Sequence, residues 1–253
     1  MHQASVGVHC PECVSGSQQQ VYTARTMPGA QGTVTRALVG LNVGIWVISI
    51  FALGATAGDA GNVWTDYGTW GPPIDVNNEW WRIISGGFLH SGIIHLGFNM
   101  YILWALGQQL ERRMGEVPYL ASYLTALIGG SFGALILSPE ARTVGASGAV
   151  FGLFGLATMA YRSRGVSIFS TGLGTILVLN LLFSFTAGVS LGGHLGGFLA
   201  GLALGALHFG VTPHGRPPFG SNKAVTLGVN VGFAAVLFVA SILAASTWMS
   251  PLL

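Results

Sequence analysis

Long apolar stretches alternate with short polar connections along most of this chain. Seven of them approach the ~20 residues that an α-helix needs to cross about 30 Å of hydrocarbon: 34–57, 88–107, 117–137, 147–161, 168–187, 190–208 and 225–247. Each is apolar as a whole, whereas the strands of a membrane barrel would alternate with a period of two. The pattern therefore predicts an all-α fold, a polytopic bundle of membrane-spanning helices.

The composition supports this class. Charged residues make up 7% of the chain and apolar residues 51%, whereas soluble domains average roughly 25% charged residues. The net charge of +2 comes largely from residues beside the spans, and there is no dense basic run, so we expect no nucleic-acid partner. We expect the lipid bilayer of the plasma membrane as the surroundings.

The basic residues predict the orientation of the chain. Only Arg82 and Arg142 fall on one side of the predicted spans, and the others fall on the opposite side: Arg25, Arg36, Arg112, Arg113, Arg162, Arg164, Arg216 and Lys223. The positive-inside rule then places the N-terminus in the cytoplasm and, after seven crossings, the C-terminus outside.

Residues 1–33 form a polar cytoplasmic tail without the apolar core of a cleavable signal peptide. The tail contains Cys10 and Cys13, and two thiolates at this spacing are half of a tetrahedral zinc site. His9 and His2 would complete a weak site, two chains would share one, or a zinc ribbon would have its first half upstream. The alternative is a pair of free thiols, because a reducing cytoplasm disfavours a disulfide.

The longest connection lies between the first two spans, at 58–87. It carries four acidic residues and four tryptophans: Asp59, Asp66, Asp75, Glu79, Trp64, Trp70, Trp80 and Trp81. A solvated outer loop with an aromatic anchor is one interpretation. We favour a semi-embedded structural element, because loops of this length usually have a function. A Pro/Gly-rich cytoplasmic loop begins the segment 209–253 and tethers the seventh span.

Four polar side chains are predicted to share one depth in the membrane. At about 1.5 Å of rise per residue from the cytoplasmic helix ends, Asn99 lies roughly 18 Å up, Ser147 about 22 Å, His194 about 21 Å and His95 about 24 Å. This layer would lie about 6 to 12 Å below the outer surface. Because such side chains are costly in hydrocarbon, the layer indicates a functional site.

The fourth span is short, which explains how Ser147 becomes recessed. From Ala146 to Tyr161 it has 16 residues, about 24 Å of helix, which is too little to reach both faces. The preceding stretch, 138–145, would dip inward where it lines a cavity or is buried in protein. The free N–H groups and positive dipole end of the helix would stabilise an oxyanion beside Ser147.

Two histidines and an asparagine supply the matching chemistry. His95 and Asn99 are four residues apart and share one helix face, where both can donate hydrogen bonds to developing negative charge. A polar clasp between helices is the alternative for this pair. His194 lies on a glycine ridge that suits close packing against the fourth span, which would bring Ser147 and His194 together as nucleophile and general base.

Each motif also has a purely structural interpretation, since glycine ridges mostly mark helix packing. The acids on the outer side all fall in loops, so we predict a dyad without a third member: Asp59, Asp66, Asp75, Glu79 and Glu140.

In combination, these motifs resemble the rhomboid family of intramembrane serine proteases. The resemblance covers residues 34–208 and rests on Trp81 and Arg82 in the first loop, the His95 and Asn99 pair, the Gly-Ala-Ser-Gly run around Ser147, and His194 followed by Gly197 and Gly201. Glu111 and Arg113 resemble the structural Glu-x-Arg pair of the family.

The resemblance implies a six-helix core over 34–208, with Ser147 as nucleophile and His194 as base, and no cofactor for catalysis. The oxyanion site would comprise His95, Asn99 and the Ser147 backbone N–H. Phe151 would stack on His194, and supporting glycines would be Gly145, Gly148, Gly197 and Gly201.

The family also suggests what the protein acts on. Its substrates are single-span membrane proteins, cut near the outer face, that enter near the second and fifth spans. Phe183 and Phe185 are therefore candidate gate residues. The seventh span is an addition seen in some members, and the Cys10–Cys13 motif looks like the end of a zinc-ribbon appendage of some bacterial relatives.

Two other functions are compatible with parts of the pattern. A catalytically silent rhomboid-like protein would bind membrane clients, but loss of the serine or histidine would be expected, and both are present. A small transporter would use the polar layer as a substrate site, but paired inverted halves are not visible in the sequence.

Overall fold

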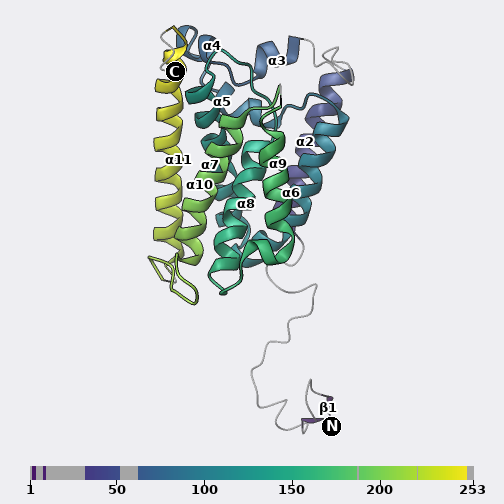
Figure 1. Cartoon of the computed structure of the whole chain (residues 1–253), viewed down its shortest axis with the longest axis vertical. Coiled ribbons are helices and arrows are strands. Elements are labelled where there is room, and N and C mark those ends of the chain that lie inside the picture. The colour runs from purple at the N-terminus through teal and green to yellow at the C-terminus, as the bar shows by residue number, and fades with distance from the viewer. Residues whose placement is uncertain are drawn as a thin grey trace.

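Within the residues that the structure describes, seven helices of 11 to 23 residues stand side by side and form the body of the molecule (Figure 1). The computed structural model describes residues 2–3, 8–9, 32–51, 62–186, 188–220 and 222–249. The helices are α2 (Thr33–Phe51), α6 (Ile93–Met114), α7 (Glu116–Leu137), α8 (Ser147–Arg162), α9 (Leu173–Phe183), α10 (Leu191–Phe209) and α11 (Lys223–Ala245). Each predicted span thus overlaps one of these helices.

The remaining elements are short. The first loop contains α3 (Asn62–Tyr67), α4 (Gly71–Val76), α5 (Arg82–Ser85) and the 3-10 helix η1 (Gly86–Phe88). Two further 3-10 helices are η2 (Ile168–Thr171) and η3 (Ser246–Met249). Near the N-terminus, β1 (His2–Gln3) pairs antiparallel with β2 (Val8–His9), a two-residue pairing that hydropathy did not predict. The fold is all-α in its helical body.

Four of the described helices are long and apolar enough to cross a membrane by themselves: α2, α7, α10 and the run from Lys223 to Met249 that joins α11 and η3. The helices α8, with 16 residues, and α9, with 11, are shorter. The last turn of α6 carries Arg112 and Arg113. By length and composition alone, these three helices therefore do not qualify as membrane-crossing helices.

The second and fifth predicted spans differ from the observed helices. We expected a span over 88–107, but α6 begins at Ile93, because Gly92 is extended and the residues before it form η1 and a turn. It then continues through polar residues to Met114 and ends at Gly115, whose φ is +88°. The expected span over 168–187 is divided at Gly172, where φ is +75°, into η2 and α9.

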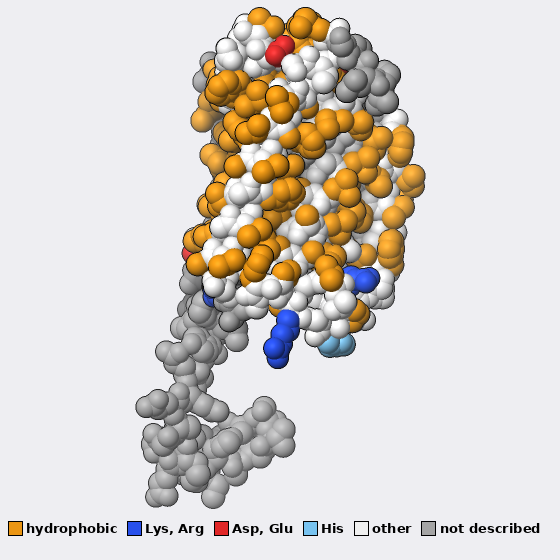
Figure 2. Space-filling model, turned by 90° about the vertical axis from the view of Figure 1, so that its left-hand side faces the viewer, with side chains coloured by type: hydrophobic (Ala, Val, Ile, Leu, Met, Phe, Trp, Pro, Cys, Tyr) orange, Lys and Arg blue, Asp and Glu red, His pale blue; other side chains and the backbone are white. Residues whose placement is uncertain are grey.

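Apolar side chains cover the middle of the face that α11 presents. Figure 2 shows this hydrophobic band, with Lys and Arg side chains at its lower end. Exposed apolar residues on α11 include Val229, Val236 and Leu243. A surface of this kind suits hydrocarbon rather than water.

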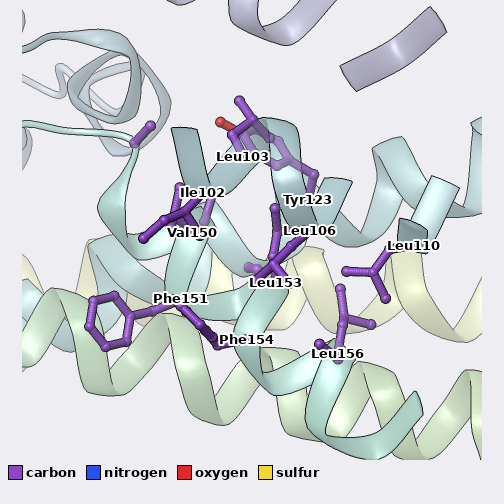
Figure 3. Packing of buried hydrophobic residues seen from close by; sticks show 14 of the residues in the cluster. Ile102, Leu103, Leu106, Leu110, Tyr123, Val150, Phe151, Leu153, Phe154 and Leu156 are labelled. Atoms are coloured by element: carbon purple, nitrogen blue, oxygen red, sulfur yellow. The ribbon is translucent and has the colours of Figure 1, made fainter. Parts of the chain in front are cut away.

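The core lies where α8 packs against α6, α7 and α10. Figure 3 shows Val150 of α8 beside Ile102 of α6, with Leu153 and Leu106 further along the same interface. All four side chains are buried. This interface fixes the start of α8 relative to α6.

Close packing between α8 and α10 depends on residues without side chains. A Cβ added at Gly197 would overlap the carbonyl oxygen of Gly148, and one added at Gly201 would overlap that of Gly152. The two backbones are therefore in direct contact, as the glycine spacing predicted.

Glu111 and Arg113, in the last turn of α6, connect this helix to α2 and α8. The buried carboxylate of Glu111 accepts hydrogen bonds from the backbone N–H groups of Val34 (3.0 Å) and Thr35 (2.9 Å), and so caps the start of α2. Arg113 donates to the carbonyl oxygen of Ala160 on α8 at 3.1 Å. These contacts connect three helices at one end of the bundle.

Candidate active site

The first loop holds the segment that leads into α8. Thr69 and Thr143 exchange backbone hydrogen bonds of 3.0 and 2.9 Å, and the N–H of Gly71 donates to the carbonyl of Pro139 at 2.8 Å. Residues 138–146 contain no helix, in agreement with the irregular stretch predicted before the fourth span. The loop thus positions the N-terminus of α8.

Arg82 organises this loop from within. Its buried guanidinium forms an ion pair with Glu79 at 2.5 Å and donates to the carbonyl oxygens of Thr65 (2.7 Å) and Gly68 (3.2 Å). The neighbouring Trp81 is half-exposed and lies under the same guanidinium, 4.9 Å from ring centroid to charge centre. Trp81 and Arg82 therefore stabilise the first loop, and neither lines the cavity described next.

One cavity of about 700 Å³ contains the predicted polar layer. Its walls come from α6, α8, α9 and the start of α10. Ser147, His194, His95 and Asn99 all line it. Four side chains from three helices, predicted to share a depth, therefore face one space.

Ser147 is the first residue of α8, and the preceding Ala146 has no side chain to cap the helix. The first-turn N–H groups are therefore available to a ligand in the cavity. Gly145 has φ +127°, and a Cβ there would lie 2.6 Å from Cε1 of His95 and 3.6 Å from the Ser147 Oγ. The imidazole of His95 thus occupies the space that a side chain at position 145 would fill, so this position requires glycine.

His95 is held so that one ring nitrogen faces this space. Its Nδ1 lies 2.9 Å from the Ser91 hydroxyl and 3.4 Å from the Ser91 backbone nitrogen, which can only donate. Nδ1 is therefore the acceptor, and in the neutral ring the proton is on Nε2. Nε2 is the atom beside Gly145, 2.8 Å from the position of an added Cβ. His95 consequently presents a hydrogen-bond donor beside Gly145, in the cavity that Ser147 also lines.

Asn99 lies one turn further along α6 and is buried. Its amide donates one hydrogen bond to the carbonyl oxygen of His95 at 2.9 Å. The second N–H of the amide has no partner among the described residues and is available to the cavity.

His194 is held on two sides. Its ring stacks on Phe151 with centroids 4.1 Å apart and planes inclined by 14°. Its Nδ1 lies 2.5 Å from the hydroxyl of Ser184, in the turn after α9. No hydrogen bond joins His194 to Ser147 within the described part of the chain, although both face the cavity. Such bonds are often long in unliganded enzymes and tighten when substrate binds.

Three serines at the site were missed by reasoning from the sequence: Ser91, Ser184 and Ser190. Ser190 caps α10 by accepting a hydrogen bond from the N–H of Gly193 at 3.1 Å. Its position just before a predicted span was a usable signal, since serine is a preferred N-cap residue. Ser184 had no such signal, because ten residues separate it from the histidine that it contacts.

A family model matches the part of the chain that forms this site. The model of the Rhomboid domain matches residues 77–211, which run from the end of the first loop through α10. That match covers more than half of the chain. The chain belongs to the rhomboid family.

Relatives of this rhomboid include proteins from bacteria and eukaryotes. Rhomboid protease GluP of Bacillus subtilis is 37% identical over 138 residues, which are 51% of this chain and 27% of GluP. Rhomboid-like protease 3 of Toxoplasma gondii is 36% identical over 141 residues, 52% of this chain and 53% of the relative. Putative rhomboid protease YdcA of Bacillus subtilis is 35% identical over 137 residues, 52% of this chain and 69% of YdcA. The matched part of this rhomboid thus spans about a quarter of the length of GluP and about half of the length of rhomboid-like protease 3.

The family and the apolar helices together make this rhomboid a multi-pass membrane protein. The two proposed gate residues differ in their relation to the cavity. Phe183 is among the lining residues, whereas Phe185 lies outside the lining and is 71% exposed.

No group of three or more potential metal ligands occurs within residues that the structure describes. Cys10 and Cys13 lie outside those residues, so zinc binding by the tail stays a prediction.

Proposed function

We propose that this rhomboid is an intramembrane serine endopeptidase that cleaves single-span membrane proteins in or near their transmembrane helix. The observation that carries the proposal is the shared cavity of Ser147, His194, His95 and Asn99. A hydroxyl, an imidazole and two amide or imidazole donors around one space are the groups that acyl transfer requires.

In the first step, the Ser147 hydroxyl attacks the scissile carbonyl carbon while Nε2 of His194 takes its proton. Negative charge develops on the carbonyl oxygen. It is stabilised by the Nε2–H of His95, the amide of Asn99 and the backbone N–H groups at the start of α8. The position of His95 beside Gly145 supports this assignment.

In the second step, His194 returns the proton to the leaving amine, and the acyl group stays on Ser147. A water molecule then enters, loses a proton to His194 and attacks the acyl carbon. The bond between that carbon and the Ser147 Oγ breaks, His194 returns the proton to Oγ, and the carboxylic acid product leaves. Every proton passes through His194, and the sequence of steps requires no metal or cofactor.

The cavity admits only a short piece of substrate. A helix is about 10 Å wide and rises 1.5 Å per residue, so the cavity corresponds to roughly 6 residues of helix. Its walls include Phe98 of α6 and Leu179 and Phe183 of α9, which are apolar and exposed. These features support entry of one transmembrane segment from the lipid between α6 and α9.

We also propose that the end of the bundle with Arg112, Arg162 and Lys223 faces the cytoplasm of a cell whose plasma membrane contains the protein. This orientation follows from the distribution of basic residues. It brings Ser147, at the opposite end of α8, closer to the outer face.

A silent client-binding protein is the second candidate. The observation in its favour is the absence, among described residues, of a hydrogen bond between Ser147 and His194. An apolar cavity would hold a helix without cleaving it. The two functions differ in whether Ser147 reacts.

The test uses the purified protein in detergent, a model single-span substrate and a fluorophosphonate that labels reactive serines. We expect cleavage and labelling by the wild type, and loss of both in Ser147→Ala and His194→Ala, with thermal midpoints retained. Exposed residues provide matched controls, Ser170→Ala and His214→Asn, which should behave like the wild type. Cleavage retained by either site variant would contradict the dyad, and a wild type that binds substrate without cleaving it would favour the silent protein.

A further inference from the structure

Ser184 contacts His194 at the ring nitrogen for which the sequence predicted no third catalytic-site residue. It follows the last residue of α9, is 2% exposed, and places its Oγ 2.5 Å from Nδ1 of His194. The same Oγ lies 2.9 Å from the carbonyl oxygen of Asn180, to which it donates.

The hydroxyl has a single proton, which determines the direction of both hydrogen bonds. Because the carbonyl of Asn180 can only accept, the Ser184 proton lies on that side. The oxygen of Ser184 then accepts a hydrogen bond from Nδ1–H of His194. The neutral ring consequently has a free lone pair on Nε2, which is the form that can take a proton from Ser147.

The chain of hydrogen bonds ends on a helix terminus. Asn180 lies in the last turn of α9, and its carbonyl accepts hydrogen bonds from both the hydroxyl of Ser184 at 2.9 Å and the backbone N–H of Ser184 at 3.2 Å. The C-terminal end of a helix carries partial negative charge. When His194 becomes positive, the bonds from imidazolium to hydroxyl to carbonyl strengthen together. The helix end thus provides negative potential without an ionised carboxylate, which would be costly at membrane depth.

We propose that Ser184 is a positioning residue, which fixes the tautomer of His194 and stabilises its protonated form through the C-terminal end of α9. It has the role that a carboxylate has in three-residue serine protease sites. Ser184 keeps its own proton throughout: the proton from Ser147 goes to Nε2 and then to the leaving amine, while Nδ1–H stays in place. This inference rests on the proposed function of His194.

Ser184 does not line the cavity, where the described lining of α9 is formed by Leu179, Asn180 and Phe183. A substrate in the cavity would touch those residues rather than the Ser184 hydroxyl. Loss of the hydroxyl should therefore lower kcat and leave KM within about 2-fold, whereas a general distortion of α9 would also change KM.

The experiment compares Ser184→Thr with Ser184→Val in the full-length protein. The two side chains have similar shape, and only threonine keeps the hydroxyl. Ser184→Ala is a second variant without the hydroxyl, for the case that valine impairs folding. Thr186→Val is the matched control, because Thr186 is exposed in the same turn and its hydroxyl contacts only the carbonyl of Phe183 among the described residues.

We expect Ser184→Val and Ser184→Ala to lower both kcat and the fluorophosphonate labelling rate of Ser147 by about 10- to 100-fold, the loss typical of one hydrogen bond to a charged group. Ser184→Thr and Thr186→Val should stay within about 3-fold of the wild type. The labelling rate matters because the reagent does not need a bound substrate helix.

Two results would overturn the inference while leaving the proposed protease function intact. One is wild-type labelling and kcat in both Ser184→Val and Ser184→Ala. The other is a loss that appears in KM or in the thermal midpoint and is not restored by threonine. A wild type that neither cleaves nor labels would overturn the proposed function, and this inference with it.

Discussion

Two histidines at this site face the same cavity in complementary states. Nδ1 of His95 accepts from Ser91, so Nε2 of His95 donates. Nδ1 of His194 contacts Ser184, whose proton is directed to Asn180, so Nε2 of His194 accepts. His95 is therefore suited to stabilise an oxyanion, and His194 is suited to take a proton. The tautomer of His95 is set by Ser91, and that of His194 by Ser184.

At the residue scale, we predict that His95→Ala lowers kcat by about 100- to 1,000-fold, the usual loss when one oxyanion donor is removed. KM should change little, because the donor acts mainly on charge that develops in the transition state. Cleavage kinetics with a model substrate check this. The control is Gln109→Ala on the exposed face of the same helix, where the side chain donates to the carbonyl of Ala105 and accepts a long hydrogen bond of 3.4 Å from the hydroxyl of Tyr161. A kcat for His95→Ala within about 3-fold of the wild type would remove His95 from the oxyanion site.

At the element scale, the contact between α8 and α10 decides whether Ser147 and His194 share a cavity. Helix α10 carries His194 near its start, and α8 begins with Ser147. The glycines that follow each residue allow the two backbones to touch. A widening of this contact would separate the hydroxyl from the imidazole even if each helix stayed intact.

We therefore predict that Gly197→Ala destabilises the protein by about 1–3 kcal/mol, as overpacking does, and lowers cleavage in parallel. The physical reason is the overlap of the new Cβ with the carbonyl of Gly148. Thermal unfolding in detergent and substrate cleavage are the measurements. Gly228→Ala on α11 is the control, because an added Cβ would meet no described atom within 4 Å apart from its chain neighbours and the adjoining backbone of α11. Equal thermal midpoints for the two variants would show that the close contact does not limit stability.

At the scale of the whole molecule, the proposed protease function requires that a substrate carbonyl reach the cavity between α6, α8, α9 and α10. A peptide bond within an intact helix has its carbonyl hydrogen-bonded four residues ahead and is shielded by side chains. The substrate must therefore unwind locally before the carbonyl reaches the donors around Ser147.

This requirement predicts that helix-breaking residues near the cleavage site accelerate cleavage. A glycine in place of alanine costs a helix about 1 kcal/mol, which corresponds to roughly a 5-fold increase in the unwound population. We expect kcat/KM to rise by a similar factor in a substrate series that places glycine or leucine beside the scissile bond. A leucine substrate cleaved as fast as its glycine counterpart would contradict the need for unwinding.

Much of this protein could be predicted from local properties of the sequence. Hydropathy located every long helix, because an apolar stretch near membrane thickness has few other stable structures. The glycines after Ser147 and His194 correctly indicated that α8 and α10 pack closely. Helix ends were less predictable, since α6 continues through a charged turn to Gly115 and α9 starts only after Gly172.

The sequence by itself determined the class of fold, the number of long helices and the chemical identity of the polar layer, because these depend on hydropathy, helix rise and side-chain type. Only the tertiary structure decided how that layer is arranged: which nitrogen of each histidine faces the cavity, and that Ser184 stands behind His194. The reason is that proton positions depend on contacts across turns and between helices. No local pattern specifies such contacts, whereas burial inside a bundle makes each unsatisfied polar group find a partner.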